Sequence, residues 1–300
     1  MNIRKRVTIE RWNICFSKAE PPDIISGAID ISCFSWMKHD YKDRAFADPF
    51  ILKADSDFIE VLVEELPFMR ADAYLSKLKI DANSFRLLEK KTILKNKTHF
   101  SYPQIIRYNG NIYIVPENTV SGKLDLYRYD EEAEQCCFVK TLINTPVADA
   151  TIVFHNNEYW LFGNKKDNKN LYLWKSAEIF GNYEPQEGVL IKSNFKGSRM
   201  AGAFFEIAGK LYRPSQDCNT GYGAGTIIQR VDKLSLSEYR ENEVEHIYPF
   251  PQSYYNKGTH TLNFYNELCV ADGYTHEVNY FKGSWYWLCR NIRRFFIKSY

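Results

Sequence analysis

Hydrophobic and polar residues follow one another along this chain in a unit that returns five times. Each unit has a short junction, an apolar stretch, a polar turn and a second apolar or aromatic stretch. One turn is Asn109-Gly110, and Asn-Gly between two apolar stretches is a strong signal for a β-hairpin. The units read "ADPFILKADSDFIEVLVEE" from Ala47, "SYPQIIRYNGNIYIVPEN" from Ser101, "ADATIVFHNNEYWLFGN" from Ala148, "MAGAFFEIAGKLYRPSQD" from Met200 and "GTHTLNFYNELCVADG" from Gly258.

Further strand-like segments lie between the hairpins. They alternate apolar and polar positions, as half-buried strands do. Each hairpin with its following segments therefore supplies about four strands. The third strands are predicted at residues 73–81, 124–130, 171–177 and 226–232, and fourth strands at segments such as 85–94 and 136–143.

The spacing of the units predicts the fold. About fifty residues per unit suits a four-stranded propeller blade, and helical patterns are scarce. We therefore predict an all-β chain with one five-bladed β-propeller over residues 1–282, whose last blade is completed by strand material from residues 1–40. The alternative is a β-sandwich or two smaller β domains. Blade starts are expected near Asp48, Tyr102, Asp149, Ala201 and Thr259, with steps of 54, 47, 52 and 58 residues.

The amino-acid composition of the chain limits the kinds of partner and ligand that we expect it to bind. The net charge is +2, from 39 basic and 37 acidic residues, so no overall field attracts nucleic acid and we expect no such partner. The seven cysteines and six histidines lack ligand or disulfide spacing, so we predict no metal site and no disulfide framework. No phosphate-binding loop or dinucleotide fingerprint is present, and no cofactor is expected. The N-terminus has no apolar stretch of signal-peptide length, which predicts a cytoplasmic protein.

A propeller brings the starts of its innermost strands together at the central channel, although these residues lie about fifty apart in sequence. The ends of the second strands lie near the same face or its rim. Glu64 and Glu65 end an alternating strand, so one should face inward and the other outward. The predicted cluster comprises Asp48, Tyr102, Asp149, Arg199 or Ala201, Thr259 and His260 from strand starts, and Glu64 or Glu65, Glu117, Gln216, Asp217 and Asp272 from strand ends.

Several segments resemble a known propeller domain. "FADPFI" with "EVLVEE", "SYPQII…GNIYIVPE", "DATIV…YWLF", "YRPSQDC" and "GTHTLN" are similar to the N-terminal domain of plant glucosamine inositolphosphorylceramide transferases, which also occurs in bacterial proteins. The similarity covers residues 40–275, approximately. More distantly, the chain resembles the five-bladed propellers of glycoside hydrolase families 43, 32 and 68, which place carboxylates at blade starts around the cavity.

The distant resemblance implies roles for the acids. Glycoside hydrolysis needs a general acid and a second carboxylate as nucleophile or base. Hydrolases of this fold typically have three acids in the site, an Asp on blade one, an Asp on blade three and a Glu on blade four. Asp48 and Asp149 match the first two, but blade four begins "SRMAGAFF" and has no acid. We assign Asp48 as base or nucleophile, Asp149 as the group that orients the transition state and Glu117 as substitute acid. Asp48 could instead be a turn residue before Pro49.

Basic residues accompany these acids. Arg199, Arg213 and His260 are expected to hold an anionic group, such as the phosphate of a sugar phosphate, because Arg binds phosphate through two parallel hydrogen bonds. The alternative is that the cations neutralise the neighbouring acids in structural ion pairs. The full substrate-binding prediction comprises Glu64, Tyr102, Arg199, Arg213, Gln216, Asp217 and His260.

The tail, residues 283–300, mixes aromatic and basic positions. "GSWYWLCRNIRRFFIKSY" predicts an amphipathic helix that is too short and too charged to span a bilayer. Residues 285–298 could lie in a membrane interface, which would hold the protein at the inner membrane face, or pack against the propeller with their basic side chains in solvent.

These observations indicate a carbohydrate-active propeller. The leading hypothesis is that it binds a sugar, an activated sugar or a sugar phosphate in its central cavity and takes part in glycan or glycolipid biosynthesis by glycosyl transfer. The alternatives are a non-catalytic glycan-binding or scaffold module, which the missing acid of blade four favours, and a glycosidase or glycoside phosphorylase. The sequence selects neither the sugar nor its linkage.

Overall fold

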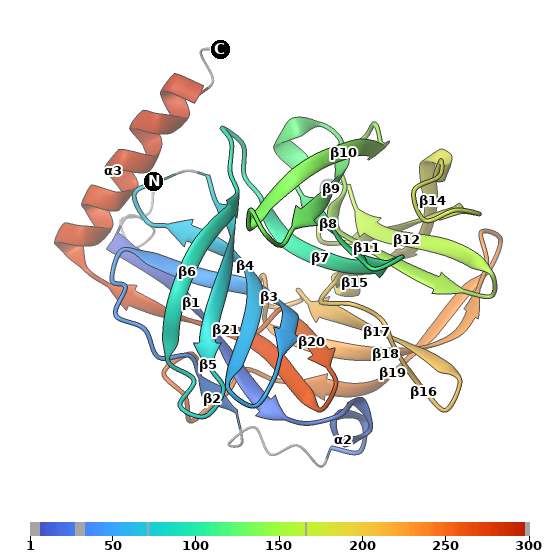
Figure 1. The fold of residues 1–300 in the computed structure, drawn as a ribbon, viewed down its shortest axis with the longest axis horizontal. Helices are drawn as coiled ribbons and strands as arrows, with labels where there is room; N and C mark the ends of the chain where they lie inside the picture. Colours follow the sequence, from blue (N-terminus) through green and yellow to red (C-terminus); the bar gives the residue numbers. More distant parts are fainter. Residues whose placement is uncertain (1–6, 28–33, 71, 166, 298–300) are drawn as a thin grey trace.

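The computed structural model of the 300-residue chain describes residues 7–27, 34–70, 72–165 and 167–297, and they form five antiparallel sheets arranged around one axis (Figure 1). The prediction of a five-bladed β-propeller is confirmed. Blade one holds β3 (Arg44–Ala54), β4 (Phe58–Pro67), β5 (Tyr74–Asp81) and β6 (Leu87–Leu94), and blade two holds β7 (Ser101–Tyr108), β8 (Asn111–Glu117), β9 (Leu124–Asp130) and β10 (Gln135–Ile143).

The remaining blades follow the same plan with two differences. In blade four the innermost position is divided between two short strands, and blade five takes its outer strands from the N-terminus. Blade three holds β11 (Ala148–His155), β12 (Glu158–Asn164), β13 (Asn170–Ser176) and β14 (Glu184–Ser193). Blade four holds β15 (Lys196–Met200), β16 (Phe205–Ile207), β17 (Lys210–Asp217), β18 (Gly225–Leu234) and β19 (Tyr239–Ile247). Blade five holds β20 (Leu262–Tyr265), β21 (Leu268–Val278), β1 (Thr8–Lys18) and β2 (Ser35–Trp36).

The inner hairpins have the turns that the sequence predicts. Asn109 and Gly110 join β7 to β8 with φ values of 48° and 72°. Asn156 and Asn157, between β11 and β12, have φ values of 52° and 62°. Positive φ at both central residues matches the right-handed twist of the flanking strands, so these turns set the register of each inner pair.

The first and last parts of the chain share blade five. All eleven residues of β1 pair with β21, from Thr8 opposite Val278 to Lys18 opposite Leu268, and Figure 1 shows the blue strand β1 beside the orange-red strand β21. The expectation that residues 1–40 complete the last blade is therefore confirmed. This pairing closes the ring of blades with backbone hydrogen bonds.

The hydrophobic core lies between neighbouring blades. Ile14 and Phe16 of β1 pack in one cluster with Phe46 and Val61 of blade one, and all four side chains are fully buried. Near the axis another cluster joins four blades through Phe50, Tyr102, Phe162 and Met200. Aromatic side chains such as Phe16, Phe46 and Tyr102 thus fill spaces between the sheets.

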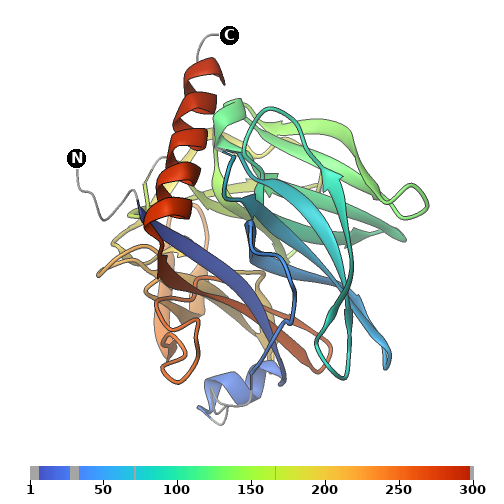
Figure 2. The same cartoon turned by 90° about the vertical axis from the view of Figure 1, so that its left-hand side faces the viewer.

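A C-terminal helix, α3 (Tyr280–Ile297), stands against the outer side of the propeller beside β1 (Figure 2). Its Tyr286 is buried and lies 5.6 Å from Phe68, measured between ring centroids. Phe281 and Trp285 are 90% and 55% exposed. The helix therefore packs on the propeller through one face and leaves aromatic residues in solvent on another. The side chains of Arg290 and of residues 292–300 lie outside the described residues.

None of the described helices is long and apolar enough to cross a membrane. A short helix, α2 (Pro21–Ile25), follows β1 at the opposite end of that strand from α3 (Figure 1).

Phe16→Ala tests whether closure of the ring through β1 stabilises the fold. The side chain of Phe16 is fully buried between blades, so we expect its truncation to lower the free energy of unfolding by about 3–5 kcal/mol in urea denaturation. Phe195→Ala is the matched control, because Phe195 is 48% exposed, and it should cost less than about 1 kcal/mol. Equal losses in the two variants would contradict the expectation.

Candidate functional site

Three innermost strands carry a non-glycine residue with positive φ at the predicted blade start. These residues are Asp48 of β3, Tyr102 of β7 and Asp149 of β11, with φ values of 50°, 43° and 48°. Each lies within a register shift between the first two strands of its blade, as in a β-bulge. Asp adopts this backbone region more readily than Tyr, so the conformation of Tyr102 costs free energy that the surrounding fold must offset.

Carboxylates tie these bulges together from blade to blade. The backbone N–H of Asp48 donates to Asp272 Oδ2 of blade five, and the N–H of Tyr102 donates to Asp48 Oδ2, each over 3.1 Å. The N–H of Asp149 donates to Glu117 Oε2 of blade two, also over 3.1 Å. Each carboxylate therefore accepts a hydrogen bond from a backbone N–H of the next blade. The acids thus hold the innermost strands in place as well as placing negative charge near the axis.

Asp48, His260 and Asp272 form a buried cluster where blades five and one meet. His260 Nδ1 lies 2.7 Å from Asp272 Oδ2, and His260 Nε2 lies 3.5 Å from Asp48 Oδ1. Asp48 Oδ1 also accepts a hydrogen bond from Thr261 Oγ1 over 2.9 Å. Burial raises the pKa of Asp48 to about 7, against the opposing effect of His260. Burial lowers the pKa of His260, but Asp272 and Asp48 outweigh it and raise that pKa to about 9.

The same three residues could offer ligand atoms to a metal ion. One atom from each of Asp48, His260 and Asp272 lies within 4.8 Å of the others. The oxygens of Asp272 also accept the backbone N–H groups of His260 and Thr261, so a metal would compete with hydrogen bonds that hold blade five. The expectation of no metal site stays a prediction.

Arg199 lies between the acids of blades two and three. Its Nε is 2.5 Å from Asp149 Oδ2, and its Nη2 is 3.3 Å from Glu117 Oε2. Its Nη1 donates to Asn168 Oδ1 over 2.7 Å, and its guanidinium lies 5.1 Å from the ring centroid of Tyr222. Arg199 therefore forms ion pairs with the neighbouring acids, which is the alternative to binding an anionic group of a ligand.

Asp149 is held by side chains of blade four. Besides Arg199, its Oδ2 accepts a hydrogen bond from Gln216 Nε2 over 3.1 Å. Burial raises the pKa of Asp149 to about 7; Arg199 opposes this rise and Glu117 adds to it. At neutral pH the protonated and the ionised form of this carboxyl group are therefore both populated.

The residues of the axial site differ in how far their side chains are exposed to solvent. Asp48 and Asp149 are only 4% and 2% exposed, whereas Tyr222 is 43% exposed and the His99 side chain 35%. His99 Nε2 lies 2.8 Å from Glu64 Oε1. A ligand that approaches from solvent would meet Tyr222 and His99 first, with the acids behind them.

Tyr102 does not present its hydroxyl to solvent. The residue is fully buried, and its hydroxyl hydrogen-bonds with Thr151 Oγ1 of blade three over 2.9 Å. Its ring packs edge-on against Phe50. The side chain of Tyr102 therefore joins three blades rather than facing a ligand.

Arg213 and Asp217 have partners away from the axial acids. The guanidinium of Arg213 is fully buried and donates two hydrogen bonds to Glu241 of β19, over 2.7 and 2.8 Å. Asp217 lies at the end of β17, with its Oδ2 3.6 Å from His246 Nε2. Arg213 therefore also forms an ion pair within the protein, which is the alternative to binding an anionic group of a ligand.

The two glutamates at the end of β4 have different partners, but both are buried, so neither takes the outward position that the alternation predicted for one of them. Glu64 contacts His99, whereas Glu65 is fully buried and accepts hydrogen bonds from Tyr74, Ser76 and Lys90 within blade one. Glu65 is thus part of the interior of its blade.

His99 and Tyr222 are the site members that sequence reasoning misses. His99 stands just before β7, so its place ahead of a blade start is the signal that could have found it. Tyr222 lies in the Gly-rich loop between β17 and β18, whose sequence matches neither a phosphate-binding loop nor a dinucleotide fingerprint. Burial lowers the pKa of His99, but Glu64 outweighs it and raises that pKa to about 9.

Solved structures show the class of fold. An exo-β-1,3-galactanase from Phanerochaete chrysosporium superposes with a TM-score of 0.52 and 10% identity, over 69% of this chain and 53% of the other. A family 117 glycoside hydrolase from Zobellia galactanivorans superposes with a TM-score of 0.53 and 9% identity, over 92% of both chains. The chain is a five-bladed propeller of the glycoside hydrolase-like kind.

The family follows from the sequence itself. Residues 8–266 match the family described as "Glucosamine inositolphosphorylceramide transferase 1, N-terminal", and the chain belongs to it. The Arabidopsis thaliana transferase of that name is 30% identical over 242 residues, which are 78% of this chain and 31% of that protein. The Oryza sativa subsp. japonica protein is 27% identical over 220 residues, 70% of this chain and 29% of its own length. The chain thus spans about a third of the length of these relatives.

Stability should fall as the pH rises from about 6.5 to about 9. His99 and His260 have a pKa of about 9 in the folded protein and about 6.5 when unfolded. The folded state therefore binds more protons in this window, and the stability these residues add is fully present below about pH 6.5 and lost as the pH passes about 9. Urea denaturation across this range measures the slope.

The variant His260→Gln should flatten that slope, because one of the two titrating groups is removed. His276→Gln is the control, since the His276 side chain is 43% exposed on the outer part of blade five. A slope of opposite sign in the wild-type chain, or an unchanged slope in His260→Gln, would refute the assignment.

Proposed function

We propose that this propeller binds a sugar or an activated sugar at its axial site and serves glycan or glycolipid assembly. The observation that carries the proposal is the partly exposed ring of Tyr222, which lies beside Arg199 and hence beside Asp149 and Glu117. An aromatic surface with a few converging polar groups is the usual lining of a small-molecule site. The flat apolar face of a sugar would pack on the ring while its hydroxyl groups meet the carboxylates.

The charges of the site suit an amino sugar in activated form. The relatives' name includes glucosamine, whose amino group is largely protonated near neutral pH and would bind next to Glu117 or Glu64 by charge-assisted hydrogen bonds. His99 and Arg199 are the basic side chains that could contact the phosphate of a nucleotide sugar. Each already has an acidic partner, Glu64 for His99 and Asp149 with Glu117 for Arg199, so a phosphate would have to share these side chains with the acids.

Tyr222→Ala tests the stacking surface. Its side chain is partly exposed, so the fold should survive the truncation, and we expect the dissociation constant for the sugar to rise about tenfold. Isothermal titration with glucosamine, N-acetylglucosamine and their uridine diphosphate derivatives provides the measurement. Tyr248→Ala is the matched control, because Tyr248 is 60% exposed beyond the outermost strand of blade four. Absence of binding to every member of the panel in the wild-type chain would remove the proposal.

The second candidate function is a binding module without catalysis. The axial acids are already engaged, since Asp48 accepts hydrogen bonds from Tyr102 and Thr261, and Asp149 from Arg199 and Gln216. A nucleophile or general acid must reach the reacting atoms of the substrate. Glycosyl transfer at this site would therefore require ligand binding to release an acid from its present partners.

Asp48→Asn and Asp149→Asn separate transfer from binding. Asn adopts positive φ readily, so both variants should keep the bulge and the fold, as circular dichroism would show. If the domain transfers sugar, each variant should lower turnover of a nucleotide sugar at least a hundredfold. Sugar binding with no turnover in the wild-type chain would support the module, and cleavage that needs inorganic phosphate would indicate a phosphorylase.

A further inference from the structure

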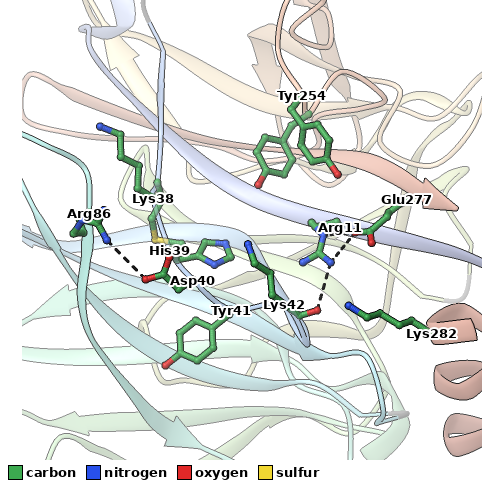
Figure 3. Close-up of a pocket in the computed structure, with 12 residues that line it drawn as sticks. Arg11, Lys38, His39, Asp40, Tyr41, Lys42, Arg86, Tyr254, Glu277 and Lys282 are labelled. Carbon is green, nitrogen blue, oxygen red and sulfur yellow. Dashed lines mark hydrogen bonds and ion pairs between the residues drawn. The ribbon is translucent and has the colours of Figure 1, made fainter. Parts of the chain in front are cut away.

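A pocket of roughly 640 Å³ lies outside the axial site, where blades five and one meet and α3 begins. Figure 3 draws Lys38 and Arg86 at one end of it and Arg11, Glu277 and Lys282 at the other. None of its lining residues belongs to the axial cluster. The lining comprises Arg11, residues 37–42, Arg86, Tyr254, Tyr255, Glu277 and Lys282.

The pocket carries an excess of positive charge. Its two carboxylates are already engaged, because Glu277 lies 2.8 Å from Arg11 and Asp40 lies 3.8 Å from Arg86. Three lysines remain, and no carboxylate of the described residues lies within 4.0 Å of their ammonium groups. These lysines are Lys38, Lys42 and Lys282.

His39 adds an unsatisfied polar atom to this pocket. Its Nδ1 is buried and has no hydrogen-bond partner among the described residues. Burial, with Arg11 and Lys42, lowers the pKa of His39 to about 4, so the ring is neutral and one nitrogen carries a hydrogen. His39 therefore adds no charge to the pocket, and the basic character of the pocket comes from its lysines and arginines.

Exposed aromatic residues of α3 lie next to the pocket. Phe281, Trp285 and Leu288 are 90%, 55% and 43% exposed. Their spacing of four and three residues puts them on one face of the helix. That face borders the one that carries Lys282, which lines the pocket. Aromatic side chains of this kind settle at the level of lipid headgroups, where basic residues meet anionic lipids.

We propose that this pocket binds the phosphate-bearing headgroup of an anionic membrane lipid while the exposed face of α3 enters the bilayer interface. Lys38, Lys42 and Lys282, which have no carboxylate partner among the described residues, supply donors for phosphate oxygens, and the exposed apolar face of α3 supplies the apolar contact. A soluble phosphate ester would use the lysines but leave Phe281 and Trp285 in water. The net charge of the whole chain is only +2, so the attraction is local to this pocket rather than a property of the entire surface.

Vesicle co-sedimentation of the 300-residue chain tests the proposal. The wild-type protein should bind vesicles of phosphatidylcholine that contain phosphatidic acid and should not bind vesicles of phosphatidylcholine alone. The triple variant Lys38→Glu, Lys42→Glu and Lys282→Glu should lower the partition coefficient at least tenfold. The matched control reverses three exposed lysines of other surfaces, namely Lys18→Glu, Lys169→Glu and Lys210→Glu, and should retain most of the binding.

A second pair of measurements separates the lipid from a soluble phosphate. Phe281→Ser with Trp285→Ser should lower binding to vesicles and leave the affinity for glycerol phosphate unchanged. Tight binding of glycerol phosphate with no binding to phosphatidic acid vesicles would overturn the membrane assignment. Equal losses in the two lysine variants, or vesicle binding unchanged in the pocket variant, would overturn the pocket. Circular dichroism confirms that each variant is folded.

Discussion

The axis of this propeller depends on carboxylates that accept backbone N–H groups from the neighbouring blade. Asp272 holds Asp48, Asp48 holds Tyr102, and Glu117 holds Asp149. A bulge exposes a backbone donor that the regular ladder would have paired, and an acid from the next blade satisfies it. The same oxygens that maintain the fold are therefore those a ligand would have to share, which ties any chemistry at the axis to the packing of the blades.

The repeated hairpin pattern in the sequence was enough to predict most of the fold. Five hairpins with one common pattern, of which Asn109-Gly110 is the clearest, specified the blades, and the last blade is completed by strands from residues 1–40, as predicted. These features are local or periodic, so single-sequence patterns can express them. The candidate acids Asp48, Asp149 and Glu117 also follow from the periodicity, because equivalent positions in successive blades meet at the axis.

The partners of those residues could not be predicted in the same way. Asp48 and Asp272 are 224 residues apart in the chain. Arg213 of β17 and Glu241 of β19 form their ion pair across β18, the strand between them, and the direction of both side chains depends on the register of these strands. A one-residue change of register reverses which face a side chain occupies. For this reason Arg213 could be placed on blade four from sequence, whereas its engagement by Glu241, and the exposure of Tyr222, had to come from the three-dimensional arrangement.

The pairing of β1 with β21 also constrains the order in which the molecule can form. Cys15 pairs with Ala271, 256 residues later in the chain. Until β1 and β21 pair, each strand has unpaired backbone groups along one edge, and the ring of blades is open between them. Contacts of such sequence separation are slow to form, and unpaired strand edges favour association between chains. Closure of the ring therefore also removes two strand edges that could associate with other chains.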